Sequence, residues 1–125
     1  MTEQTAQRDV LPATRMDAAA HAQSAAFHKD FVDQVKDAIA KNRVVVVGMG
    51  WNPHVGKAHA ALKAAGVAFA RVDHGNYLTG WRRRLAVKMW TGFPTFPQVF
   101  VDGVLIGGRR DLVAWLKDGR LKASP

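Results

Sequence analysis

Cysteine is absent from the 125-residue chain. Without thiols the protein can form no disulfide, no cysteine zinc site and no iron–sulfur cluster held by its own thiolates. The sequence also lacks an apolar run long enough to cross a membrane as a helix, and residues 1–15 lack the apolar core of a signal peptide. A cytoplasmic protein without a membrane association is therefore expected.

Acidic residues are scarce in the second part of the chain. Residues 1–42 carry five Lys and Arg against six Asp and Glu, a net charge of −1, whereas residues 43–125 carry thirteen against four, a net charge of +9. Such an excess of positive charge favours association with anionic small molecules, acidic proteins or nucleic acids, but it does not choose between them.

The N-terminal residues lack a clear apolar periodicity. Residues 1–23 are rich in alanine and polar residues, which predicts a mobile N-terminal arm with helix near its end, before a single domain over 24–125. The domain is expected to begin with a helix over 25–42, with Ser24 as its cap. Its apolar residues recur at the spacing of one helical face: Phe27, Phe31, Val35 and Ile39.

A strand, a helix and a second strand are expected next. The β-branched run over 43–48 predicts a buried central strand, because it is uniformly apolar and too short for a helix. Asn52 followed by Pro53 is typical of a helix start, so a helix is expected from Pro53 to about Ala65. Residues 67–73 predict the second strand.

The last part of the domain predicts two helices and a hairpin. Residues 78–90 are expected to form an amphipathic helix with Trp81, Leu85 and Met89 directed inward and its three arginines and Lys88 outward. Asp102-Gly103 joins two short strands as a hairpin turn, and a last helix follows over 109–118. This order predicts an α/β fold with a four-stranded mixed sheet flanked by helices.

The segment over 91–108, TGFPTFPQVFVDGVLIGG, resembles a stretch of the glutaredoxins, and of monothiol glutaredoxins especially. Those proteins carry WPTFPQ, a strand and a turn, and then LIGG, and the order of elements agrees over about residues 27–120. The resemblance implies a thioredoxin fold and a cis peptide bond at Phe96-Pro97, beside which the backbone pairs with glutathione. The local pattern alone leaves a trans bond at the start of a strand equally open.

The residue matched to the glutaredoxin nucleophile is an asparagine. Glutaredoxins place CxxC or CGFS at a helix start that stabilises a thiolate, and the matching tetrapeptide here is Asn52-Pro53-His54-Val55. A carboxamide cannot attack a disulfide or bind iron as a thiolate does. No catalytic residue and no iron–sulfur cluster are therefore expected.

The positions that the resemblance assigns to glutathione are partly retained. Arg84 matches an arginine that binds the glycine carboxylate of the tripeptide, but Arg109 and Arg110 stand where a small residue and an acid are usual, and Met49 replaces a lysine. An arginine would repel the ammonium group of glutathione, so a more negative ligand fits better. The candidate ligand-binding residues are Asn52, Pro53, His54, Arg84, Thr95, Phe96, Pro97, Gly108, Arg109 and Arg110.

Three functions are compatible with these residues. The first is a redox-inactive module that binds an anionic ligand, such as a glutathione-like molecule, or an acidic protein in the former active-site groove. The second is an oxidoreductase in which glutathione itself supplies the sulfur and the protein only positions it. The third is nucleic-acid binding by the basic, aromatic segment over 81–90. The spacing of the histidines, His54 included, does not match a metal site, so no metal is expected.

Overall fold

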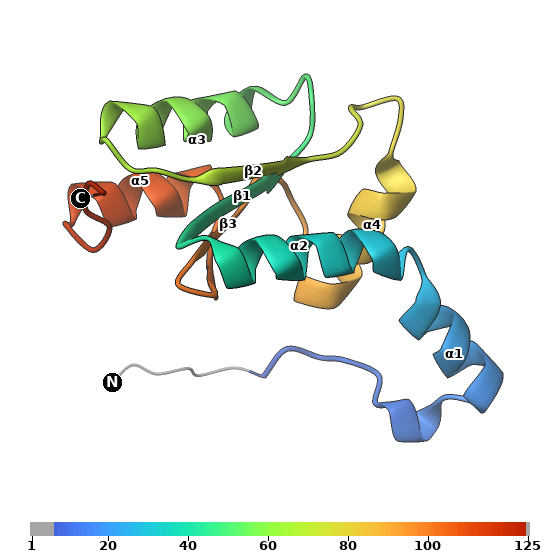
Figure 1. The fold of residues 1–125 in the computed structure, drawn as a ribbon. Coiled ribbons are helices and arrows are strands. Elements are labelled where there is room, and N and C mark those ends of the chain that lie inside the picture. The colour runs from blue at the N-terminus through green and yellow to red at the C-terminus, as the bar shows by residue number, and fades with distance from the viewer. Residues whose placement is uncertain (1–6, 125) are drawn as a thin grey trace.

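The computed structural model describes residues 7–124. Its centre is a four-stranded mixed sheet with the strand order β2-β1-β3-β4 (Figure 1). The strands are β1 (Val44–Gly48), β2 (Ala70–Asp73), β3 (Gln98–Val101) and β4 (Val104–Gly107). The β1–β2 pair is parallel, whereas β1–β3 and β3–β4 are antiparallel. The expected α/β sheet is confirmed.

Helices cover both faces of the sheet. They are α2 (Lys29–Lys41) and α4 (Trp81–Thr91) on one face, and α3 (Pro53–Ala64) and α5 (Arg109–Lys117) on the other. Every residue of β1 is buried, and its valines alternate between the two faces. Val45 and Val47 pack with α2 and α4, while Val44 and Val46 pack with α3 and α5. This confirms β1 as the central strand.

Gly48 brings the start of α3 close to the end of β1. A Cβ atom at this position would lie 2.7 Å from Cγ1 of Val55, which is buried in the first turn of α3. A larger residue would therefore push α3 away from the sheet. This close approach positions Asn52, which immediately precedes α3, beside the ends of the central strands.

The N-terminal helix differs from the expectation. The chain forms a short 3-10 helix (Ala13–Arg15) and α1 (Ala18–Ala26) before α2. His28 adopts a left-handed conformation with φ of 41°, which separates the two helices. The expected cap at Ser24 is wrong, because Ser24 lies inside α1; Asp17 caps that helix instead, accepting a hydrogen bond from the N–H of Ala19.

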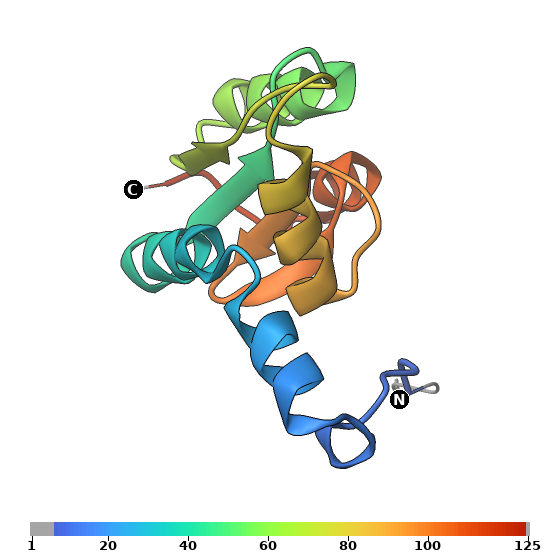
Figure 2. The ribbon, with the colours of Figure 1, turned by 90° about the vertical axis from the view of Figure 1, so that its right-hand side faces the viewer.

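The predicted mobile arm over 1–23 lies partly outside the described residues. Within the described part, α1 contains no buried residue and projects from the body of the molecule (Figure 2). The mobility of this arm stays a prediction. None of the helices in the described range 7–124 has the length and apolar character that crossing a membrane requires.

The buried face of α4 is also different from the expected one. Val87 and Arg84 are buried, whereas Trp81, Leu85 and Met89 are exposed, so the inward orientation expected for these three residues is wrong. The helix begins at Trp81 rather than at residue 78, because the preceding residues form a turn. The loop over 74–80 contains backbone carbonyl oxygens that need hydrogen-bond donors, and Arg84 supplies them. These bonds turn the Arg84 side of the helix inward.

Candidate ligand-binding groove

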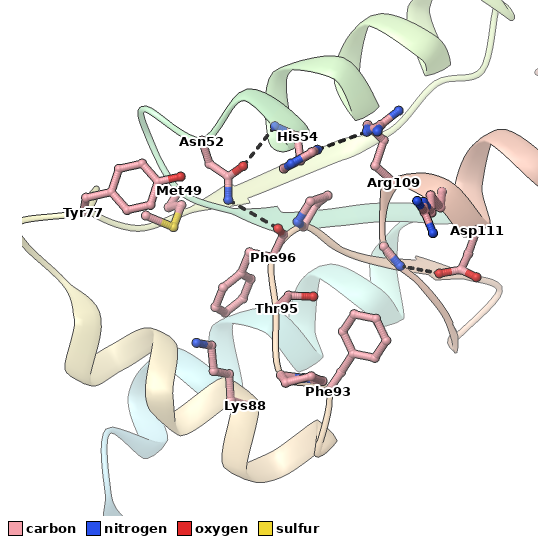
Figure 3. A pocket seen from close by; sticks show the side chains of 14 residues that line it. Met49, Asn52, His54, Tyr77, Lys88, Phe93, Thr95, Phe96, Arg109 and Asp111 are labelled. Atoms are coloured by element: carbon pink, nitrogen blue, oxygen red, sulfur yellow. Dashed lines mark hydrogen bonds between the residues drawn. The ribbon is translucent and has the colours of Figure 1, made fainter.

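A groove of about 550 Å³ opens between the start of α3, the loop before β3 and the start of α5 (Figure 3). It brings together most of the candidate ligand-binding residues that the sequence predicted. Those that line it are Asn52, His54, Thr95, Phe96, Pro97, Gly108, Arg109 and Arg110. Pro53 and Arg84 are not part of its lining.

Asn52 joins two walls of the groove. Its Oδ1 accepts a hydrogen bond of 2.9 Å from the N–H of His54 and thereby caps α3. Its Nδ2 donates to the carbonyl oxygen of Phe96 at 3.3 Å. Pro53 occupies the first helical position, where a missing N–H costs nothing. The side chain at the start of α3 therefore has a structural role in holding the loop over 93–97.

A buried glutamine holds the same loop from behind. Gln98 is fully buried at the start of β3, and its Nε2 donates to the carbonyl oxygen of Phe93 at 2.9 Å. The hydroxyl of Thr91 donates to Oε1 of Gln98 at 3.0 Å and accepts from the N–H of Phe93 at 3.1 Å. The Phe96-Pro97 peptide bond within this loop is cis. These bonds fix the backbone that forms the floor of the groove.

The start of α5 forms the third wall. The N–H of Gly108 donates to the carboxylate of Asp111 at 2.9 Å, so this acid is engaged with the backbone. Nε of Arg109 donates to Nδ1 of His54 at 3.2 Å and links α5 to α3 across the end of the groove (Figure 3). Because Arg110 also lines the groove, positive charge gathers along this wall.

Arg84 does not line the groove. Its guanidinium donates to the carbonyl oxygens of His74, Asn76 and Thr79 at 2.8, 2.8 and 2.7 Å. Burial lowers the pKa of this guanidinium from its ordinary value, and its hydrogen-bonding partners are carbonyls rather than a carboxylate. Arg84 thus organises the loop over 74–80, and its bonded donors serve these carbonyls.

Sequence reasoning left six of the lining residues out of the candidate set: Met49, Tyr77, Lys88, Phe93, Pro94 and Asp111. Tyr77 belongs to the loop that Arg84 organises, where no periodic pattern marks its position. Lys88 was assigned to the outer face of its helix, but it stands one turn after Arg84, and its Nζ lies 5.5 Å from the ring centre of Phe96. Because Arg84 does not line the groove, its spacing from Lys88 gives no signal in the sequence, and only the contact with Phe96 in the fold reveals Lys88.

The charges of the groove favour an anion. Lys88, Arg109 and Arg110 provide three cations, and Asp111 is the acid in the lining. Within the part of the chain that the structure describes, no three histidines or carboxylates come together as a metal site. The groove therefore has the chemistry of an anion-binding surface with aromatic walls.

Comparison with known proteins decides the family. A family model of glutaredoxin matches residues 44–106, which are just over half of the chain. A glutaredoxin-like protein from Dictyostelium discoideum is 50% identical over 95 residues, which cover 76% of this chain and 77% of that relative. The chain belongs to the glutaredoxin family.

Solved glutaredoxin structures share this fold. Wheat glutaredoxin is 27% identical, with a TM-score of 0.62 over 74% of this chain and 86% of that structure. A buckwheat glutaredoxin in complex with glutathione is 20% identical, with a TM-score of 0.65 over 77% of this chain and 87% of that structure. The thioredoxin fold expected from the resemblance is confirmed.

The basic helix of this glutaredoxin-family domain has several intramolecular partners. Arg83 forms an ion pair of 2.7 Å with Asp30 on α2. The guanidinium of Arg82 lies over the rings of Trp81 and Phe27 at 5.2 and 5.8 Å. Because Arg84 is buried, the three consecutive arginines do not form a free basic row of the kind that binds a phosphate backbone.

Proposed function

We propose that this protein is a redox-inactive member of the glutaredoxin family that binds an anionic ligand in the groove. The observation that carries the proposal is the position of Asn52. The residue that replaces the family nucleophile has no thiol chemistry, and both ends of its carboxamide are hydrogen-bonded within the protein. The chain contains no cysteine that could take over the reaction.

The cations of the groove support a ligand that is more negative than glutathione. Glutathione carries two carboxylates and one ammonium group, and Arg110 stands where an acid of the family would bind that ammonium. A guanidinium at this position repels an ammonium and attracts a carboxylate. The proposed ligand is therefore glutathione-like in size but lacks a free ammonium group.

The residues have separable roles in this proposal. Arg109 and Arg110 bind acidic groups of the ligand at the start of α5, and Lys88 provides a cation on the opposite wall. Phe93 and Phe96 contribute apolar surface that excludes water from these contacts. Asn52 holds the two walls together and takes no part in chemistry.

A matched pair of ligands tests this preference. Trp51 is 65% exposed next to Asn52, so its fluorescence can report binding. We expect glutathione acetylated on its amino group to bind up to about fivefold more tightly than glutathione, since one exposed charge pair contributes at most about 1 kcal/mol. Equal affinity for both ligands, or binding of neither, contradicts the proposal.

Variants on one helix locate the preference. Arg110→Glu should abolish the advantage of the acetylated ligand, because the carboxylate restores a partner for the ammonium group. Lys117→Glu makes the same charge change at the exposed C-terminal end of α5, away from the groove, and should leave the preference unchanged. If both variants act alike, the general charge of the protein rather than the groove determines binding.

A disulfide assay tests the redox part separately. With glutathione and a small disulfide, the wild-type protein should not exceed the uncatalysed rate, whereas Asn52→Cys should gain turnover because it restores a thiol at a helix start. Wild-type turnover would instead support the second candidate, a glutathione-dependent oxidoreductase. That candidate is kept because Thr95, Phe96 and Gly108, which match family glutathione positions, line the groove.

A further inference from the structure

The outer face of α4 is an apolar surface. Trp81, Leu85 and Met89 follow one another at the spacing of a single helical face and are 53%, 38% and 48% exposed. Leu78, in the loop just before α4, is also exposed. Within residues 7–124 these side chains stay exposed, and the N-terminal segment reaches only the end of the helix, where Arg8 lies against Gly92. We call this surface the α4 face. Contiguous exposed apolar residues of this kind mark an interaction surface.

The charges around the α4 face restrict what can cover it. Arg82 and Lys88 border it, and α4 contains no acidic residue. Direct pairing of two α4 faces would bring the cations of both copies together, which costs free energy. The covering element must therefore be poor in Lys and Arg.

The α1 helix has the complementary properties. It has nine residues, six of which are alanine, and none of them is buried. Residues 16–28 contain no Lys or Arg, and Asp17 stands at the start of the helix. An isolated helix of this length is only marginally stable in water, so a stable α1 requires a surface on which to pack.

The joint between α1 and α2 directs α1 away from its own α4 face. His28 is left-handed, Phe27 packs at the edge of the core, and the guanidinium of Arg82 lies over the Phe27 ring. These contacts hold the end of α1, while its body extends away from the sheet and its covering helices (Figure 2). Folding α1 back onto its own α4 would break this joint.

We infer that the protein forms a symmetric dimer in which α1 of each copy packs on the α4 face of the other copy. The small alanine side chains of α1 let its backbone approach the large side chains of Trp81, Leu85 and Met89. Small residues of one copy thus pack against large residues of the other. Twofold symmetry makes the exchange reciprocal and buries two such contacts. This inference is independent of the ligand proposed for the groove.

Analytical ultracentrifugation of the full-length protein tests the dimer. The wild-type protein should sediment at twice its chain mass of 13.7 kDa. Leu85→Glu should raise the dimer dissociation constant at least about tenfold, because it places a charge in an apolar contact. Val113→Glu is the matched control, since Val113 is 41% exposed on α5 and the charge change is the same. Circular dichroism confirms that each variant is folded.

A mixing experiment tests the exchange itself. Ala22→Pro should break α1 and yield a monomer, because proline disrupts a helix interior. Neither this variant nor Leu85→Glu alone retains an intact contact. Mixed together, they should form a heterodimer, since intact α1 from the Leu85→Glu copy can pack on the intact α4 face of the Ala22→Pro copy.

Three results would overturn the inference. If the wild-type protein stays monomeric at the highest soluble concentration, the α4 face does not bind a second copy of the chain. Equal effects of Leu85→Glu and Val113→Glu exclude the α4 face from the dimer. Dimerisation of wild type without a heterodimer from the mixed variants excludes the reciprocal exchange.

Discussion

The side-chain amide of Asn52 donates a hydrogen bond to the carbonyl oxygen of Phe96, 3.3 Å away. The same side chain caps α3 through the N–H of His54. The position that holds a reactive thiol in other glutaredoxins thus holds a connection between a helix and the loop that faces it. Loss of the nucleophile is accompanied by a structural role for its replacement.

Substitutions at Asn52 should separate the contribution of the α3 cap from that of the hydrogen bond to Phe96. Asn52→Ala removes both and should lower the free energy of unfolding by about 1 to 2 kcal/mol. Asn52→Ser keeps an oxygen that caps the helix and should cost less. Urea denaturation measures both variants, and an unchanged stability of the alanine variant would contradict the structural role.

Arg84 should be irreplaceable even by lysine. Its planar guanidinium reaches three carbonyl oxygens at once, and an ammonium group on a flexible stem cannot reproduce that geometry. Arg84→Lys should lower the free energy of unfolding by about 3 kcal/mol. Arg82→Lys, on an exposed position of the same helix, should change it by less than about 0.5 kcal/mol. Similar losses in both variants would show that the loop does not depend on Arg84.

Gln98 should affect both stability and the groove. Gln98→Leu leaves the carbonyl oxygen of Phe93 without its buried donor and should cost about 2 kcal/mol in urea denaturation. The same change at the exposed Gln34 of α2 serves as the control and should be nearly neutral. Because the Phe93 loop lines the groove, ligand affinity should fall in the Gln98 variant alone. A variant with full affinity would show that the loop keeps its shape without this bond.

His59 should make stability depend on pH. This side chain is 7% exposed, its Nε2 has no hydrogen-bonding partner, and it stacks on Phe69. Burial, together with the charges of Arg71 and Lys63, lowers its pKa from the ordinary 6.5, while Asp73 opposes the shift. The unfolded chain therefore binds a proton at His59 more readily than the folded protein does. The unfolding free energy is unaffected by this group above about pH 6.5, and it falls as the pH drops toward the lower pKa of the folded state.

The phenylalanine variant isolates that contribution. His59→Phe retains an aromatic ring against Phe69 but cannot bind a proton. Between pH 7 and pH 5 the unfolding free energy of the wild type should fall more steeply than that of the variant, by at most about 1.4 kcal/mol per pH unit. His74, whose pKa burial also lowers, remains in both proteins and contributes equally to both slopes. Parallel slopes would mean that His59 is not protonated on unfolding in this range.

The sheet could be predicted because its strands carry unambiguous local patterns. The valines of β1 have no helical alternative at that length, and Asp102-Gly103 accepts the positive φ angles of a hairpin turn. The N-terminal helices could not be divided, because the break at His28 uses a left-handed residue without a glycine or proline to mark it. Local sequence gives no sign of such a joint.

The face of α4 was mispredicted because apolar periodicity takes no account of contacts with the preceding loop. Trp81, Leu85 and Met89 form a regular apolar stripe, and periodicity alone assigns such a stripe to the core. Inward placement of Arg84 is favourable because the loop directly before α4 supplies three carbonyl oxygens. The groove residues that belong to the glutaredoxin-like motifs could be predicted, because a local sequence match fixes their positions. Tyr77 lies in a loop that carries no such motif, so it could not be predicted.

The capping of α3 gives the groove a direction. Pro53, the first residue of the helix, has no N–H. The N–H of His54 donates to the Asn52 side chain, and the N–H groups of Val55 and Gly56 donate to the Asn52 carbonyl oxygen. This end of the helix therefore offers an incoming acid no vacant backbone donor among its described residues. A bound molecule should thus lie with its acidic terminus toward the arginines of α5 and its uncharged portion against Asn52. This orientation is the reverse of one in which the dipole of α3 attracts the anion.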